Sequence, residues 1–252
     1  KIASAASPDV RIVSVAKGVE NETLLTTTHV LDEALPSVPL EHIGVLYGPS
    51  HAEEVVEGKP AAVVAAAHSL DVASEIQDVF MTDRLRVYVN PDVTGVEIGG
   101  SVKNVLAIAT GMAEGLGFGD NTSAAIVTRG LAEIRRLGIA MGANAATFGG
   151  LAGIGDLVVT CMSPLSRNRH LGELIGRGMT LAEAEQSMTM VAEGVSTTRS
   201  VHELSKRHGI ELPITEAVYS ILFKQKSPQE VVAELMSREA KREDWLPNFL
   251  QG

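Results

Sequence analysis

Short apolar runs alternate with amphipathic segments over the first part of the chain. The runs are rich in β-branched residues and have the length of strands. They occupy 11–17, 43–48, 61–67 and 85–89. The segments between them have helical spacing and occupy 23–35, 51–58 and 71–80. Such alternation predicts a mainly parallel sheet with crossover helices.

The pattern changes after Asn90-Pro91-Asp92. From Val93 onward the chain shows long helical patterns broken by glycines, and no segment is typical of a strand. We therefore place a domain boundary here. We expect an α/β domain at 1–92 and an all-helical domain at 93–252.

Residues 93–115 predict one long helix, which would span about 33 Å. Its core-facing anchors are Val93, Ile98, Val102, Val105, Leu106 and Ala109. A second stripe consists of glycine and alanine, with Lys103 and Asn104 rising from its middle. Small residues around a long cation leave room for a ligand, and burial would lower the pKa of the lysine from about 10.4 toward values useful for acid–base chemistry. The alternative is a lysine whose ammonium reaches solvent over a close helix packing.

Two predicted strands end in residues suited to a ligand. The first ends at Lys17, and the second ends at Gly48, which begins the segment Gly48-Pro49-Ser50-His51-Ala52-Glu53. In open parallel sheets ligands bind beyond the carboxyl ends of the strands, where glycine allows a close approach of the main chain. The structural alternatives are a surface lysine and a capping box formed by Ser50 and Glu53.

Two further segments carry polar groups in unusual places. Asp156 lies among apolar residues, so it either caps the following helix or orients a lysine or a substrate hydroxyl. Ser166-Arg167-Asn168-Arg169 comes directly before a helical pattern. The first N–H groups of a helix together with guanidinium groups form an anion site, which predicts a phosphate ligand. The alternative is a basic surface turn.

Composition excludes several classes of protein. The formal charge is −10 without basic blocks, and aromatic residues make up 4%, so nucleic-acid binding is not expected. No apolar run approaches the roughly 20 residues of a membrane helix. The single cysteine, Cys161, rules out an intrachain disulfide and favours a reducing cytoplasm. The seven histidines lack the spacing of metal ligands, so we expect no metal site.

Taken in order, several motifs resemble one family. They are AKGVE, GPSHAEE, GGSVKNV, GLAGIGDLVVTC, SRNRHLG and VAEGVSTT. Together they are similar to the bacterial NAD(P)-dependent glycerol-3-phosphate dehydrogenases over nearly the whole chain. The resemblance implies a Rossmann domain followed by a helical substrate domain, so this chain would hold the C-terminal portion of a Rossmann-type parallel sheet.

The resemblance also implies an activity and a set of residues. Dihydroxyacetone phosphate and sn-glycerol 3-phosphate, a phospholipid precursor, would be interconverted with NAD or NADP. Lys103 matches the catalytic lysine, which donates a proton to the carbonyl oxygen as hydride arrives. The substrate contacts match Lys17, Gly48, Ser50, Lys103, Asp156, Ser166, Arg167 and Asn168. The cofactor contacts match Lys17, Ala52, Arg167, Val191 and Glu193. The partner implied is a small phosphorylated substrate, and we expect a cytoplasmic homodimer.

Three departures from the family pattern accompany this resemblance. The Gly-rich loop for the cofactor pyrophosphate is absent, together with the first strands of the Rossmann domain. His51 stands where an aromatic residue is frequent, and Ala16 stands where a hydroxyl residue is common. Two other functions stay open. One is a related dehydrogenase of hydroxy acids, and the other is a non-catalytic, truncated phosphate-binding remnant.

Overall fold

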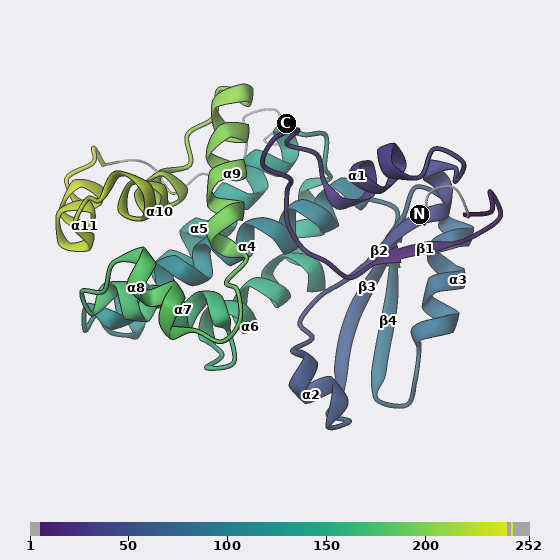
Figure 1. Cartoon of the computed structure of the whole chain (residues 1–252), viewed down its shortest axis with the longest axis horizontal. Coiled ribbons are helices and arrows are strands. Elements are labelled where there is room, and N and C mark those ends of the chain that lie inside the picture. The colour runs from purple at the N-terminus through teal and green to yellow at the C-terminus, as the bar shows by residue number, and fades with distance from the viewer. Residues whose placement is uncertain (1–5, 241–242, 244–252) are drawn as a thin grey trace.

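The computed structural model describes residues 6–240 and residue 243, which form a small sheet joined to a group of helices (Figure 1). The sheet part contains β1 (Ile12–Ser14), α1 (Thr27–Ala34), η1 (Leu40–His42), β2 (Ile43–Tyr47), α2 (Ala52–Val56), β3 (Ala61–Ala67), α3 (Leu70–Phe80) and β4 (Leu85–Asn90). The helical part contains α4 (Val93–Gly115), α5 (Asp120–Ala140), η2 (Ala145–Gly149), η3 (Leu151–Gly155), α6 (Asp156–Met162), α7 (Arg167–Gly176), α8 (Leu181–Ser187), α9 (Gly194–His208), α10 (Pro213–Lys224) and α11 (Pro228–Met236). The expected α/β region followed by helices is confirmed, and no strand follows β4 within these residues.

The sheet is mixed, although a mainly parallel one was expected. Its described strands lie in the order β1-β2-β3-β4. The outer pairs are parallel, whereas β2 and β3 run antiparallel. The prediction of a crossover between β2 and β3 is therefore wrong. The segment between them holds only the five-residue helix α2, which is enough because antiparallel neighbours need no crossover.

The apolar run of β3 is buried on both faces of the sheet. Val63, Ala65 and Ala67 belong to the cluster that includes α3, whereas Val64 and Ala66 belong to the cluster that includes the first turns of α4. Successive side chains of a strand point to opposite faces, so a strand covered on both sides has no polar position. This is why an uninterrupted run of alanine and valine forms β3 with the predicted limits.

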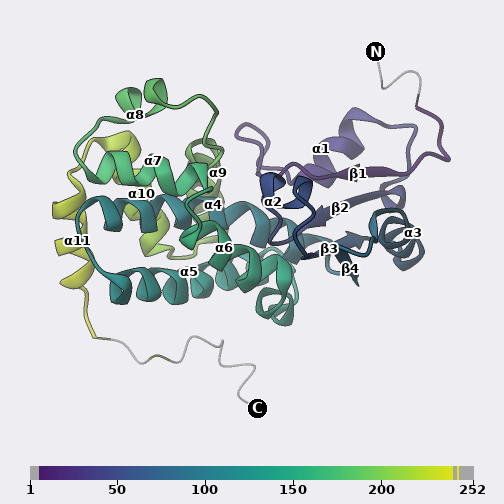
Figure 2. The same ribbon diagram turned by 90° about the horizontal axis from the view of Figure 1, so that it is seen from below.

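Helix α4 is the central element of the chain. It has the predicted limits, and the Asp92 carboxylate accepts a hydrogen bond of 2.9 Å from the N–H of Gly95 at its start. All but three of its 23 residues are buried. It packs against β2 and β3 and then against α5, α6, α7 and α9, and Figure 2 shows it between α5 and α7. The expected division into an apolar stripe and an open stripe is thus replaced by burial on all sides.

Helices α4 and α7 cross with their main chains in contact. A Cβ atom on Gly111 would overlap the carbonyl oxygen of Arg169, and one on Gly172 would overlap that of Ile108. Only glycine allows such an approach. The crossing ties the start of α7 to the middle of α4.

Two elements differ by three or more residues from a predicted limit. β1 stops at Ser14, whose hydroxyl accepts a hydrogen bond of 3.2 Å from the N–H of Ala16 as the chain leaves the sheet. The helix predicted at 23–35 begins only at Thr27, because Leu24 has a left-handed conformation with φ of 63°. None of the described helices combines the length and the apolar character of a membrane span.

The α4–α7 crossing generates a prediction about stability. Gly111→Ala should lower the free energy of unfolding by about 2 kcal/mol or more, because the added methyl group meets a carbonyl oxygen that cannot move alone. Urea unfolding measures this difference. The control is Gly149→Ala, whose methyl group would meet nothing within 4 Å. Equal stability of the two variants would contradict the close crossing.

Candidate active site

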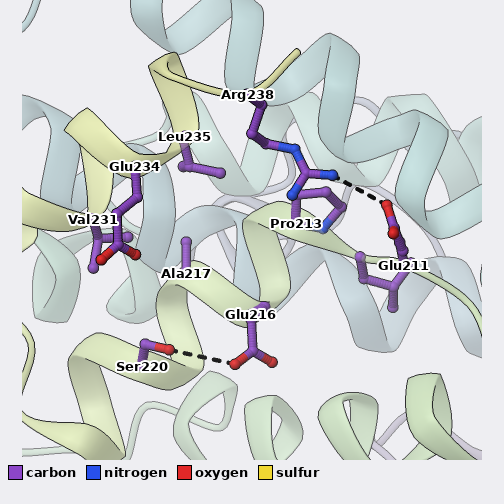
Figure 3. Close-up of a pocket in the computed structure, with 10 residues that line it drawn as sticks. Glu211, Pro213, Glu216, Ala217, Ser220, Val231, Glu234, Leu235 and Arg238 are labelled. Carbon is purple, nitrogen blue, oxygen red and sulfur yellow. Dashed lines mark hydrogen bonds and ion pairs between the residues drawn. The ribbon is translucent and has the colours of Figure 1, made fainter. Parts of the chain in front are cut away.

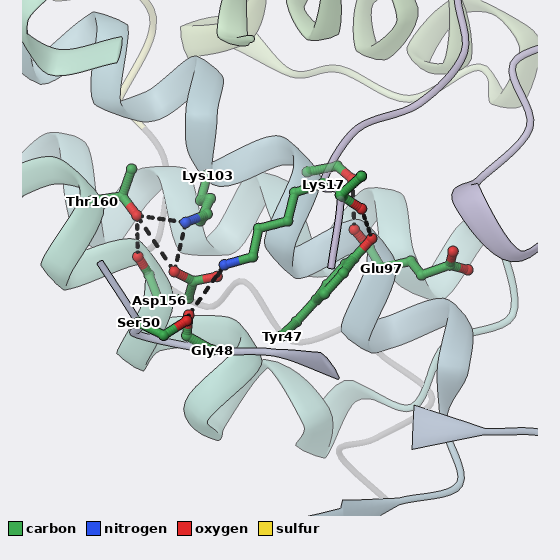
Figure 4. A network of polar contacts seen from close by, with 10 residues as sticks. Lys17, Tyr47, Gly48, Ser50, Glu97, Lys103, Asp156 and Thr160 are labelled. Carbon is green, nitrogen blue, oxygen red and sulfur yellow. Dashed lines mark hydrogen bonds and ion pairs between the residues drawn. The ribbon is translucent and has the colours of Figure 1, made fainter. Parts of the chain in front are cut away.

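One carboxylate lies between two lysines at the junction of the sheet and the helices (Figure 4). Asp156 Oδ1 is 2.5 Å from Lys103 Nζ, and Asp156 Oδ2 is 2.7 Å from Lys17 Nζ. Lys103 comes from the middle of α4, Asp156 from the first turn of α6, and Lys17 from the segment after β1. The three side chains form what we call the Lys–Asp–Lys cluster.

The cluster is shielded from solvent. The side chain of Asp156 is 1% exposed, that of Lys103 is 7% exposed and that of Lys17 is 16% exposed. Burial lowers the pKa of Lys103 to about 8, the Asp156 carboxylate opposes this shift and the charge of Lys17 adds to it. The alternative of a lysine reaching solvent is therefore wrong for Lys103.

The hydrogen bonds of Lys103 leave one direction open. An ammonium group has three N–H donors. One donates to Asp156 Oδ1, and another donates to Thr160 Oγ1 at 2.7 Å. Lys103 also lines a cavity, so its remaining donor is available to a molecule bound there.

The carboxylate of Asp156 is available to the lysines because it does not cap a helix. α6 follows directly on the π-helical turn η3, and its N-cap is Gly155 without a side-chain hydrogen bond. The capping alternative for Asp156 is therefore wrong. Thr160, one turn later, donates to the carbonyl oxygen of Asp156 at 2.6 Å.

The turn after β2 supports the cluster through its main chain. Lys17 Nζ donates to the carbonyl oxygen of Gly48 at 3.1 Å, and the Ser50 hydroxyl donates to the same oxygen at 3.3 Å. Gly48 has φ of 145°, and a Cβ atom there would lie 2.9 Å from Val63 Cα, so the position requires glycine. The alternative of a capping box formed by Ser50 and Glu53 is wrong, since α2 has His51 as its N-cap without a side-chain hydrogen bond.

The start of α7 presents the predicted anion-binding residues. Ser166 is its N-cap and accepts a hydrogen bond of 3.3 Å from the N–H of Arg169. Asn168 Oδ1 accepts from the N–H of Gly194 at 2.8 Å, and Arg167 donates to the carbonyl oxygen of Val191 at 3.2 Å. The guanidinium of Arg169 is instead paired with Glu114.

A cavity of about 610 Å³ joins these groups. The predicted residues that line it are Lys17, Ser50, Ala52, Lys103, Ser166, Arg167, Asn168 and Glu193. Three predicted residues do not line it. Asp156 is covered by the lysines, Gly48 contributes its carbonyl oxygen, and Val191 is 76% exposed. Apolar side chains of Val15, Leu46 and Val63 form part of the wall on the sheet side, which suits a flat cofactor ring.

Two residues at the site were not predicted from the sequence. Thr160 follows Asp156 by four positions, so both lie on one face of α6, and this spacing could have revealed it. Tyr47 ends β2 with its side chain directed toward Lys17, and nothing in the sequence distinguishes it from an ordinary core tyrosine.

Other features in the described part of the chain carry no comparable chemistry. A cavity of about 350 Å³ between α10 and α11 is bordered by Glu211, Glu216, Glu234 and Arg238 but by no lysine (Figure 3). Among the described residues, no group of three histidine, cysteine or carboxylate side chains is arranged for a metal ion. Burial raises the pKa of the Cys161 thiol to about 12, so it stays protonated.

Models of one protein family match both parts of the chain. The model of the NAD-dependent glycerol-3-phosphate dehydrogenase N-terminus matches residues 1–73, and that of the C-terminus matches residues 92–233.

Individual proteins are similar over most of the chain. A glycerol-3-phosphate dehydrogenase [NAD(P)+] of Salinibacter ruber is 66% identical over 242 residues, which are 96% of this chain and 71% of the relative. One of Chlorobium phaeobacteroides is 54% identical over 93% of this chain and 70% of its own length. The crystal structure of glycerol-3-phosphate dehydrogenase from Coxiella burnetii superposes with a TM-score of 0.85 at 42% identity, covering 90% of this chain and 69% of that one.

The lowered pKa of Lys103 predicts a pH dependence of stability. Between pH 8 and 10.5 the unfolded chain binds more protons at this lysine than the folded chain, so the free energy of unfolding rises with pH. In urea unfolding, the free energy of unfolding of the wild type relative to Lys103→Met should rise by roughly 2 kcal/mol between pH 7 and pH 10. The same series on Lys226→Met, an exposed lysine paired with Glu234, gives the effect of an exposed ammonium for comparison. A difference between wild type and Lys103→Met that does not change with pH would contradict the shifted pKa.

Proposed function

This chain belongs to the family of NAD-dependent glycerol-3-phosphate dehydrogenases, and we propose on that premise that the Lys–Asp–Lys cluster is its catalytic centre. The chain is an oxidoreductase that interconverts dihydroxyacetone phosphate and sn-glycerol 3-phosphate with NAD or NADP. The observation that carries the proposal is the buried Lys103 ammonium, held by Asp156 and Thr160 at the wall of the cavity.

Lys103 serves as the acid and base of the reaction. The nicotinamide cofactor, when bound, supplies or accepts the hydride. Lys103 Nζ donates a proton to the carbonyl oxygen of dihydroxyacetone phosphate during reduction and takes it back from the hydroxyl group during oxidation. A pKa of about 8 suits both directions, because the ammonium prevails at pH 7 and still releases its proton readily.

Asp156 and Lys17 support this proton transfer. Asp156 pairs with both buried ammonium groups and orients Lys103 Nζ from a distance of 2.5 Å. The cluster keeps one net positive charge, which stabilises negative charge developing on the substrate oxygen. Lys17 lines the same cavity, so we assign it a contact with the substrate, together with Gly48 and Ser50 in the turn after β2.

The start of α7 is assigned to the substrate phosphate. The first turn of a helix leaves N–H groups without intrahelical partners, and Ser166, Arg167 and Asn168 line the cavity there. A guanidinium adds charge-assisted hydrogen bonds to phosphate oxygens. In a chain with a formal charge of −10, this local positive site overcomes the repulsion of a phosphate dianion.

The cofactor is assigned to the same cavity, next to the substrate, so that Lys17 and Arg167 contact both. Its contacts are Lys17, Ala52, Arg167, Val191 and Glu193. The hydrogen bond from Arg167 to the Val191 carbonyl supports this assignment because it joins two of these residues. We place the boundary between cofactor and substrate domains at residues 92 and 93. We also propose a cytoplasmic homodimer that supplies the glycerol phosphate of phospholipids, and the single cysteine supports the location.

The assignment of Lys103 predicts a loss of turnover. With dihydroxyacetone phosphate as the acceptor, oxidation of NADH or NADPH should be seen as a fall in absorbance. In Lys103→Met, kcat should fall by about 10³-fold, since general acid catalysis contributes factors of about 10²–10⁴. Lys226→Met should retain the activity. A kcat of Lys103→Met close to that of the wild type would remove this residue from the mechanism.

The phosphate assignment predicts a loss of affinity. Arg167→Met should raise KM for dihydroxyacetone phosphate by about 10-fold or more, because it removes charge-assisted hydrogen bonds. The matched control is Arg177→Met at the other end of α7, where the guanidinium pairs with Glu173 and lies outside the cavity. Equal KM values for the two variants would place the phosphate elsewhere.

A further inference from the structure

Tyr47 lies against the Lys–Asp–Lys cluster without belonging to it (Figure 4). It is the last residue of β2, and its side chain is fully buried. It does not line the cavity, so it makes no contact with a bound substrate. Its contacts are instead with the segment that carries Lys17, with the Thr27 hydroxyl of α1 and with α4 at Gly100.

The phenol hydroxyl of Tyr47 holds the main chain directly before Lys17. It donates to the carbonyl oxygen of Ala16, and the Thr27 hydroxyl donates to the same oxygen at 3.3 Å. Ala16 has no side-chain hydroxyl of its own, so the groups that fasten this segment come from β2 and α1. Since β1 ends at Ser14, no ladder hydrogen bond holds Ala16 in the sheet.

The ring of Tyr47 fills the space between α4 and Lys17. Lys17 Nζ is 5.6 Å from the ring centroid, within the range of a cation–π interaction. On α4, a Cβ atom at Gly100 would lie 2.6 Å from Tyr47 Cδ2, so the glycine makes room for the ring. The ring therefore has a rigid support on the helix that also carries Lys103.

Burial keeps the hydroxyl in its donating form. It raises the pKa of Tyr47 well above the usual range of a phenol, and the carboxylates of Glu97, Glu193 and Asp156 raise it further. The hydrogen bond to Ala16 therefore persists throughout the pH range in which Lys103 titrates.

We propose that Tyr47 is a positioning residue for Lys17, whose hydroxyl fixes the main chain at Ala16 and whose ring supports the Lys17 ammonium on Asp156. The proposal rests on the proposed function in one respect, namely that Lys17 contacts the substrate. Tyr47 thus acts on substrate binding through Lys17.

Steady-state kinetics test this role with two variants. Tyr47→Phe keeps the ring and should raise KM for dihydroxyacetone phosphate about 3- to 10-fold, with kcat within about twofold of the wild type, since it removes one hydrogen bond. Tyr47→Leu also removes the ring and should raise KM further. Tyr88→Phe is the matched control, because Tyr88 is half exposed on β4 and lies outside the cavity.

A double-mutant cycle separates positioning from a general structural effect. In a Lys17→Met background, Tyr47→Phe should leave KM unchanged, because the group it positions is gone. An equal rise of KM in the presence and absence of Lys17 would overturn the proposal.

Chemical labelling tests the proposal without turnover. Reductive methylation followed by peptide mass spectrometry should modify Lys17 at least about 3-fold faster in Tyr47→Phe than in the wild type, with Lys226 as the internal reference. Unchanged labelling of Lys17 in both Tyr47 variants would overturn the proposal. If the wild type failed to reduce dihydroxyacetone phosphate, the proposed function would fail while the labelling still decided the role of Tyr47.

Discussion

The carboxylate of Asp156, placed between two ammonium groups, determines how the rest of the site is built. A buried charge must be paired, and here one carboxylate pairs with both Lys17 and Lys103, at 2.7 and 2.5 Å. The three groups come from the segment after β1, from α4 and from α6, so their pairing joins the sheet to the helices. Loss of Asp156 would leave two buried ammonium groups without a counter-charge, whereas loss of either lysine would leave a balanced pair.

The pairing also explains why one lysine suits proton transfer. Burial lowers the pKa of Lys103, whereas the Asp156 carboxylate opposes this shift. With Thr160 as a second acceptor, the ammonium is oriented by two fixed oxygens and keeps one donor toward the cavity. Orientation and acidity therefore have the same structural origin.

The sequence predicted those features that depend on side-chain periodicity. The limits of β3 and α4 follow from an apolar run and from a helical pattern that begins after Asp92, and both are confirmed. The direction of β3 could not be predicted, because a strand has the same side-chain period in either direction. The partners of Lys103 and the role of Tyr47 depend on segments far apart in the chain, since Asp156 is 53 positions from Lys103. Asp156 itself was noticed because a carboxylate among apolar residues demands a partner, but the residues alone could not choose between a helix cap and a lysine.

The contact of the α4 and α7 main chains at Gly111 and Gly172 has a consequence for selectivity. The lysine proposed as the proton donor belongs to one of these helices, and the proposed phosphate-binding turn begins the other. Because no side chain separates the helices at this crossing, the distance between the main chain at Lys103 and the start of α7 is set by the backbone. In the proposed function, a phosphorylated ketone fits only if its carbonyl reaches Lys103 while its phosphate reaches the start of α7. Exchanging lining side chains other than Lys103 and Arg167 would change how tightly such a molecule is held, whereas the accepted chain length would depend on this crossing.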